Sequence, residues 1–252
     1  MDQVAQLMPT LRDYPLYPYL EYRELAQSLD QQSSFVINDF IKKNPTLPPV
    51  RALSSSFINE LARREDWRGL LVFSPTEPKP VAARCNWYYA KWATGEQQVA
   101  WKGAKTIWLR GTSLPPGCDR LFSAWQAAGE QTPITTLERI RLAMVAGNSN
   151  LVNFLADQLP EDYQTIASAV KDLQNNPQNV EAFARIAGPT DFTRQATAIA
   201  FARVAREDAE NARAMIPTLV RLQKMSEQEE QSLKEAVAWR LMGSDVTTEQ
   251  AR

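Results

Sequence analysis

A repeated helix–turn–helix pattern constrains this sequence more than any other feature. Residues 137–155, LERIRLAMVAGNSNLVNFL, contain two segments of helical apolar periodicity on either side of Gly147-Asn148. The pattern recurs over residues 87–108, with a turn at Gly95, and over residues 236–251 around Gly243. A hairpin of this size has one apolar stripe on each helix and cannot bury both stripes alone. The sequence therefore predicts several helical pairs stacked side by side.

The composition is that of a packed, helix-rich protein. Of its 252 residues, 44% are apolar and 23% are charged, and the net charge is -1. Abundant Ala, Leu, Gln, Glu and Arg favour helix. The chain lacks the basic excess of nucleic-acid-binding proteins, so nucleic acid is not an expected partner. No stretch approaches the ~20 apolar residues of a membrane span, and the first residues do not have the pattern of a signal peptide.

Sequence signals for the common catalytic and metal sites are missing. The sequence contains no histidine, which excludes His-based triads, and its two cysteines are too few for a structural zinc site. It has no glycine-rich phosphate loop, GxSxG motif or HExxH motif. The spacing of its 29 acidic residues singles out no catalytic pair. We therefore predict no catalytic, cofactor-binding or metal-binding residue in this chain.

Aromatic residues are the candidates for ligand contact. Trp87 and Lys91 lie one helical turn apart at the margin of an apolar stripe, where they either face a sugar ring or acidic partner or belong to the core. The four tyrosines at positions 14, 17, 19 and 22 either wedge the first helix against the next or form a stacking platform.

Local signals predict several helix boundaries. Thr132-Pro133 reads as an N-cap followed by a proline in the first turn. Ser226 and Glu229 have the spacing of a capping box. Pro217 is predicted to kink or end the helix that contains it.

The two cysteines bracket one predicted helical pair and part of its exit loop. Antiparallel packing would bring Cys85 and Cys118 to the same end of the hairpin. A disulfide there would stabilise the fold by roughly 3 to 4 kcal/mol in the chain-entropy model. Two separate buried thiols explain the same spacing, because cysteine is among the most buried residue types. The spacing leaves both interpretations open.

Longer segments, taken in order along the chain, carry a family resemblance. They are DYPLYPYLEYR (13–23), NPTLPP (44–49), FINELARREDWRGLL (57–71), YYAKW (88–92), LERIRLAM (137–144), DYQTIASA (162–169), DFTRQ (191–195), REDAENAR (206–213) and AVAWRLMGSDVT (236–247). Together they resemble the N-terminal superhelical U-domain of the soluble lytic murein transglycosylases. Collinear segments of this length, spread over essentially the whole chain, are far more specific than a short motif.

The resemblance implies a function in the bacterial cell wall. Members of this family are periplasmic enzymes that cleave the linkage between N-acetylmuramic acid and N-acetylglucosamine in peptidoglycan and leave a 1,6-anhydromuramoyl end. Their ring-like helical U-domain is joined through a linker domain to a lysozyme-like domain, whose catalytic glutamate lies in a Glu-Ser motif. No Glu-Ser dipeptide occurs in this sequence, so the catalytic residue has no matching position here.

The resemblance also bears on the cysteines and on location. It matches Cys85 and Cys118 to a pair that forms a disulfide in the family, which favours a bridge over two free thiols. It places the chain in the periplasm. That location requires an export signal, which we expect to be missing from the front of this chain.

We predict an all-α fold, a right-handed superhelix of stacked antiparallel helix pairs, that is, an α-solenoid forming an arc of a ring. Residues 1–252 are expected to be the N-terminal part of the U-domain, with the linker and catalytic domains absent and the chain inactive alone. Its expected role is to help position peptidoglycan glycan strands, with Trp87 and Lys91 as candidate contacts. The alternative is an interaction scaffold for other periplasmic wall enzymes. A third hypothesis is an independent glycosidase with two acidic residues.

Overall fold

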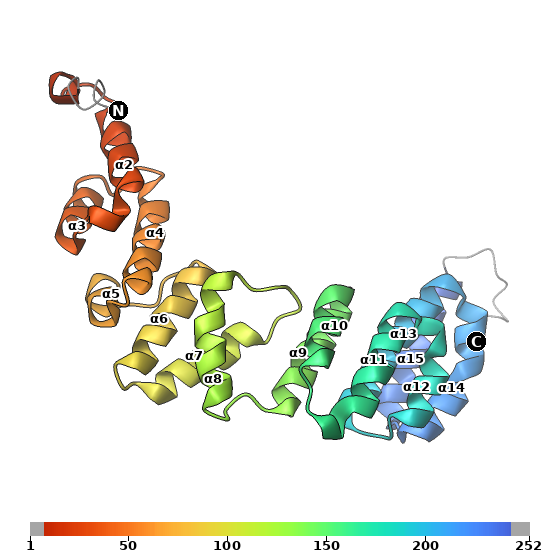
Figure 1. The fold of residues 1–252 in the computed structure, drawn as a ribbon. Coiled ribbons are helices and arrows are strands. Elements are labelled where there is room, and N and C mark those ends of the chain that lie inside the picture. Colours follow the sequence, from red (N-terminus) through yellow and green to blue (C-terminus); the bar gives the residue numbers. More distant parts are fainter. Residues whose placement is uncertain (1–7, 243–252) are drawn as a thin grey trace. The chain divides into compact units, whose positions relative to one another are not determined.

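Every element of the described chain is a helix. The structure is a computed structural model that describes residues 8–242. Within this range the chain forms fourteen α-helices, five short 3₁₀ helices and no β-strand (Figure 1). The all-α class expected from the sequence is confirmed.

The chain divides into two compact units. The first contains residues up to Ile107 together with Leu114–Glu130, and the second contains Trp108–Ser113 together with the residues from Gln131 onward. The helices of the first unit are η1 (Met8–Leu11), α2 (Tyr17–Gln27), η2 (Leu29–Gln31), α3 (Ser34–Lys43), α4 (Val50–Arg63), α5 (Trp67–Phe73), α6 (Val81–Ala93), α7 (Gln97–Trp108), η3 (Pro116–Cys118) and α8 (Asp119–Ala127). The last residue of α7, Trp108, groups with the second unit. The other helices of that unit are α9 (Pro133–Val145), α10 (Ser149–Asp157), η4 (Glu161–Tyr163), α11 (Gln164–Asn175), η5 (Pro177–Asn179), α12 (Val180–Ile186), α13 (Asp191–Glu207), α14 (Ala209–Gln223) and α15 (Glu227–Leu241).

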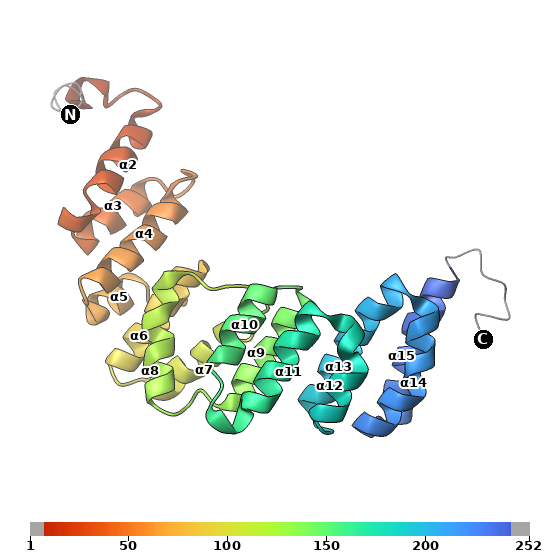
Figure 2. The same cartoon turned by 45° about the vertical axis from the view of Figure 1, so that its right-hand side comes forward.

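Antiparallel helix pairs recur in both units. A tight turn at Gly95 joins α6 to α7, and another at Gly147 joins α9 to α10. Gly95 has a φ of 100° and Gly147 a φ of 69°, in the left-handed region that favours glycine at the end of a helix. In the second unit, α10 packs between α9 and α11, and α13 packs on α14 (Figure 1, Figure 2). The predicted stacking of hairpins is confirmed within each unit. The third predicted turn, at Gly243, lies outside the described residues.

Capping residues fix two helix starts at the positions that the sequence predicts. Thr132 caps α9, where its hydroxyl accepts a hydrogen bond from the backbone N–H of Thr135 at 3.3 Å, and Pro133 follows as the first helical residue. Ser226 and Glu229 form the predicted capping box of α15. Each cap satisfies amide groups that have no partner inside the first turn of a helix.

Pro217 lies inside a continuous helix. Of the two outcomes predicted for this proline, an end of the helix is wrong, because α14 continues through it to Gln223. The side chain of Pro217 is exposed, whereas Ile216 and Leu219 on either side of it are buried. Packing of the apolar face thus holds the helix together despite the backbone hydrogen bond that the proline removes.

The core of the first unit lies between α3, α4, α5 and α6. Its buried side chains include Ile37, Phe40, Leu53, Phe57, Ile58, Leu61, Leu70, Phe73, Ala83 and Ala90. The rings of Phe57 and Phe73 meet edge to face, with centroids 4.9 Å apart. Tyr22 of α2 packs against this core, as a wedge would. Tyr14 and Tyr19, by contrast, are 57% and 43% exposed.

An ion-paired group holds the end of α4 to the connection between α2 and α3. The Glu60 carboxylate accepts hydrogen bonds from Nε of Arg63 at 2.8 Å and from Nε of Arg64 at 2.7 Å. Arg64 also donates to the backbone carbonyls of Leu29 and Gln32. The hydrogen bond from Arg63, with that from Arg64, lowers the pKa of Glu60 to about 2.

We expect Glu60→Gln to remove an acid-sensitive contribution to stability. Because the pKa of Glu60 in the folded state lies below its ordinary value of 4.5, the carboxylate contributes fully above pH 4.5 and loses this contribution as the pH falls towards 2. Thermal unfolding from pH 7 to pH 2.5 should show the variant less stable by about 1 kcal/mol at pH 7, with a smaller difference in acid. The control is Glu24→Gln in α2, since Glu24 has no ion pair in the described residues. A Glu60→Gln difference that did not change with pH would contradict this account.

Candidate functional site

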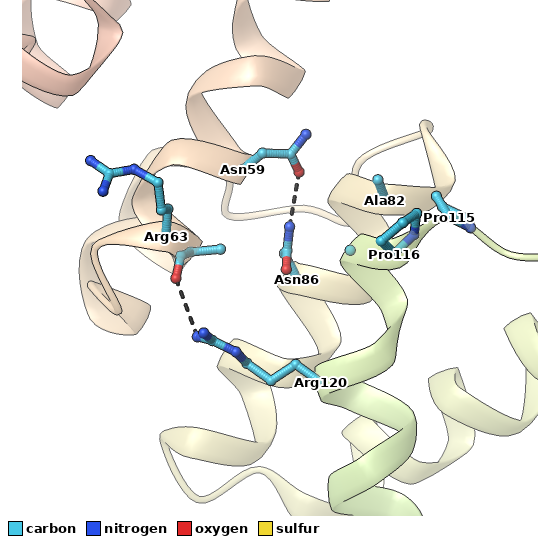
Figure 3. A pocket seen from close by; sticks show the side chains of 9 residues that line it. Asn59, Arg63, Ala82, Asn86, Pro115, Pro116 and Arg120 are labelled. Atoms are coloured by element: carbon cyan, nitrogen blue, oxygen red, sulfur yellow. Dashed lines mark hydrogen bonds between the residues drawn. The ribbon is translucent and has the colours of Figure 1, made fainter.

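A pocket of about 490 Å³ lies in the first unit between α4, α6 and the η3–α8 segment (Figure 3). Its lining residues are Asn59, Ala62 and Arg63 from α4, Ala82 and Asn86 from α6, Pro115, Pro116 and Gly117, and Arg120 from α8. The volume is within the range of roughly 300–1,000 Å³ that is usual for small-molecule sites. Two arginines and two asparagines line this pocket together with small apolar residues, and its lining includes no carboxylate.

A disulfide fixes two walls of the pocket. Cys85 and Cys118 are bonded, with Cα atoms 4.9 Å apart, and both side chains are fully buried. Asn86 follows Cys85 in α6, and Gly117 precedes Cys118 in η3. The bond therefore ties the α6 wall directly to the η3 wall. The disulfide that the family resemblance favoured is confirmed.

The two asparagines form a hydrogen-bonded pair across the pocket wall. Nδ2 of Asn86 donates to Oδ1 of Asn59 at 2.9 Å, as Figure 3 shows. Asn86 is buried in α6, whereas Asn59 is exposed on α4. The amide groups of these two residues thus link neighbouring helices at the pocket surface.

Two aromatic rings and α4 hold the guanidinium group of Arg120. Its central carbon lies 5.3 Å from the centroid of the Trp67 ring and 5.7 Å from that of the Tyr89 ring. Its Nη1 donates to the carbonyl of Ala62 at 3.4 Å and lies 3.3 Å from a carboxylate oxygen of Glu65. The side chain reaches from α8 towards α4 (Figure 3). These contacts order a long cationic side chain at the edge of the pocket.

Arg63 contributes less to the pocket than its place in the lining suggests. Two of its nitrogens bond to the two carboxylate oxygens of Glu60, each at 2.8 Å. In Figure 3 its guanidinium group points away from Asn86. Arg120 is therefore the main charged group available to a ligand.

The structure places Trp87 in the core and Lys91 against it. Trp87 is 8% exposed, and its indole Nε1 donates to the carbonyl of Ser74 at 2.8 Å. Nζ of Lys91 lies 4.9 Å from the centroid of the Trp87 ring and 2.8 Å from a carboxylate oxygen of Glu96. Neither residue lines the pocket. Contact of this pair with a glycan stays a prediction, and contacts inside the protein already occupy the groups that would make it.

Comparison with known proteins matches the whole chain to part of longer ones. No protein-family model matches the sequence. The chain is 60% identical, over all 252 residues, to proteins named soluble lytic murein transglycosylase from Escherichia coli K12 and from Salmonella typhimurium. This chain is homologous to part of a soluble lytic murein transglycosylase. It spans 39% of the length of each of these relatives.

Solved structures of lytic transglycosylases share the fold. The 70 kDa soluble lytic transglycosylase of Escherichia coli matches with a TM-score of 0.89 and 60% identity, over 100% of this chain and 41% of that chain. The lytic transglycosylase Slt of Pseudomonas aeruginosa matches with a TM-score of 0.82 and 26% identity, over 94% of this chain and 38% of that one. The helical fold is therefore common to transglycosylases of quite different sequence.

Sequence reasoning missed the polar residues of the pocket. Asn59, Asn86 and Arg120 come from three different helices, and no local motif links them. The available signal was indirect. Pairing Cys85 with Cys118 already brings the residues next to these cysteines together, among them Asn86.

Over residues 8–242, no group of three or more Cys, Asp or Glu side chains is arranged to hold a metal ion. In the same range, every helix is too short or too polar to cross a membrane.

Proposed function

We propose that residues 1–252 form a non-catalytic superhelical portion of a periplasmic soluble lytic murein transglycosylase, the N-terminal part of its U-domain. In this role the chain helps to position peptidoglycan glycan strands. The MurNAc–GlcNAc bond is then cleaved without water, giving the 1,6-anhydro product, by a catalytic domain outside these residues. The observation that carries the proposal is the 60% identity over the full chain to proteins named soluble lytic murein transglycosylase.

Stacked helix pairs are suited to a positioning role. Such stacks present extended surfaces along which a polymer can lie. Tyr14 precedes α2 and Tyr19 lies within it, and the side chains of both are exposed to a ligand. In this proposal they supply the sugar-stacking surface that the buried Trp87 does not offer.

The electrostatics of two glutamates also fit a role without catalysis. Arg63 and Arg64 lower the pKa of Glu60, and hydrogen bonds from Ser226, with the charge of Arg194, lower the pKa of Glu229. The general acid that protonates a glycosidic oxygen needs a raised pKa. These two carboxylates are therefore tuned for structural pairing and not for proton donation.

We expect the purified chain to sediment with peptidoglycan sacculi and to release no 1,6-anhydromuropeptides. Pelleting measures binding, and mass spectrometry of the supernatant measures cleavage in the same sample. Tyr19→Ala should weaken sedimentation several-fold because it removes an exposed ring. Tyr22→Phe is the matched control, because it removes only a hydroxyl group and keeps the ring of Tyr22 packed against the core.

Two outcomes would count against the proposal. Anhydro products that persist through further purification would assign catalysis to this chain. Failure to sediment would remove the support for direct glycan contact and favour the alternative, an interaction scaffold for other wall enzymes.

One observation favours that alternative. Trp239 and Met242, three residues apart at the end of α15, are both exposed and present apolar surface that a protein partner could cover. Trp239→Ala should then abolish capture of a periplasmic partner and leave sedimentation with sacculi unchanged.

A further inference from the structure

We propose that the pocket between α4, α6 and α8 binds a small ligand with a carboxylate close to an amide, such as the C-terminal end of a short peptide. The inference goes beyond the proposed function. It rests on the residues of the pocket and does not require the chain to bind glycan.

Arg120 offers an unused pair of donors to such a carboxylate. Both of its polar contacts, to the carbonyl of Ala62 and to the carboxylate of Glu65, are made by Nη1. Nε and Nη2 have no acceptor among the described residues. These two N–H groups lie on one edge of the guanidinium plane, and their spacing matches the two oxygens of a carboxylate.

The charge around the pocket leaves room for an anion. Arg63 and Arg64 pair with Glu60, and Asp30 also acts on Arg63, whereas the ion-pair partner of Arg120 is Glu65. Glu60 is shared by the first two arginines, and the Glu65 side chain is 66% exposed, so water screens its attraction to Arg120. The charge of Arg120 is therefore only weakly neutralised, and the rings of Trp67 and Tyr89 hold its guanidinium group in place. Ordering in advance lowers the entropic cost of binding.

The asparagine pair offers the complement of an amide group. Its internal hydrogen bond leaves Nδ2 of Asn59 as a donor and Oδ1 of Asn86 as an acceptor, with no partner for either atom in the described chain. If the amide nitrogen and oxygen are exchanged in both asparagines, the pair still has one free N–H donor and one free carbonyl acceptor. A peptide or N-acyl group has one N–H and one C=O, which can pair with this acceptor and this donor.

The remaining surface is small and apolar. Ala62, Ala82, Pro115 and Pro116 present hydrocarbon to the pocket, which suits a methyl-sized side chain beside the amide. The Cys85–Cys118 bond keeps the walls at a fixed separation. The pocket thus combines a pair of N–H donors for a carboxylate, a donor and an acceptor for an amide group, and apolar surface for the side chain of an alanine.

Titration with N-acetyl-alanyl-alanine tests the proposal, with isothermal calorimetry and ¹H–¹⁵N NMR as readouts. The free acid should bind saturably, and the C-terminal amide of the same dipeptide should bind about tenfold more weakly because it cannot form the bidentate pair. Arg120→Gln and Arg120→Lys should each weaken binding of the acid about tenfold, since neither side chain has the two parallel N–H donors of a guanidinium group. Arg68→Gln, an arginine of α5 outside the pocket lining, is the control and should bind as the wild type does.

The L,L and D,D forms of the dipeptide separate two sources of the ligand. Stronger binding of the D,D form would assign the pocket to wall peptides, which carry D-alanine, and stronger binding of the L,L form to ordinary peptides. Either result supports the pocket as a carboxylate site.

Three results would overturn the inference. They are no saturable binding of either form, equal affinity for acid and amide, or wild-type affinity in Arg120→Gln. If Arg120→Gln does not fold, as judged by circular dichroism, Asn59→Ala replaces it, because Asn59 is exposed and its loss should still weaken binding about fivefold.

Discussion

Replacing Cys85 and Cys118 together by alanine should lower the free energy of unfolding of the first unit by about 3–4 kcal/mol. The disulfide joins residues separated by 33 positions and thereby restricts the unfolded chain over a long loop. Both side chains are fully buried, so alanine leaves a small apolar gap, whereas serine would add a buried hydroxyl group. The effect should be large because the bridge links α6 to η3 across α7 and the loop that follows it.

Calorimetric or denaturant unfolding of the double variant measures this loss. The wild type in the presence of a reductant should unfold as the double variant does. A loss below about 1 kcal/mol would contradict the loop-closure account.

The helical elements could be predicted because their signals are local. Thr132 before Pro133 predicted the start of α9, and the spacing of Ser226 and Glu229 predicted the start of α15. Gly147 predicted the turn between α9 and α10. Each of these signals acts within one turn of backbone, so it can be read without knowing the neighbouring helices. Pro217 shows the limit of such reading, because the burial of Ile216 and Leu219 depends on tertiary packing and keeps α14 continuous.

The site residues were harder to predict because their roles depend on distant contacts. The position of Trp87 at the margin of an apolar stripe fits either a core or a surface residue. In the structure Trp87 belongs to the packed core, and the carbonyl of Ser74, in a loop before α6, accepts the hydrogen bond from its buried indole N–H. Nothing in the sequence near Trp87 signals that the loop folds back in this way.

The pocket itself had no sequence signature. Asn59, Asn86 and Arg120 are ordinary polar residues on amphipathic helices, and each has the appearance of a solvated surface position. They become neighbours only because α4 and α8 both pack on α6, and because the disulfide fixes one end of that packing. Of these causes, the sequence resemblance indicated the disulfide alone.

A large effect in the second unit is expected at Gly111. A Cβ atom at this position would lie 2.3 Å from the backbone carbonyl oxygen of Leu142 and 2.8 Å from the Cβ of Ala146, both on α9 or its end. The segment cannot simply move away from α9, because two hydrogen bonds hold it there. The Asn148 amide donates to the carbonyl of Gly111, and Arg139 donates to the carbonyl of Thr112, each at 3.3 Å.

Gly111→Ala should therefore lower the free energy of unfolding of the second unit by about 2–3 kcal/mol, because the contact is with backbone that has little room to shift. Gly117→Ala is the matched control. A Cβ there would lie 3.4 Å from the Cβ of Ala82, an ordinary contact, and we expect a change within about 0.5 kcal/mol. Urea unfolding of both variants decides the matter. Equal and small effects would show that residues 108–113 are a loose connection, whereas the expected difference would establish them as part of the packing of α9.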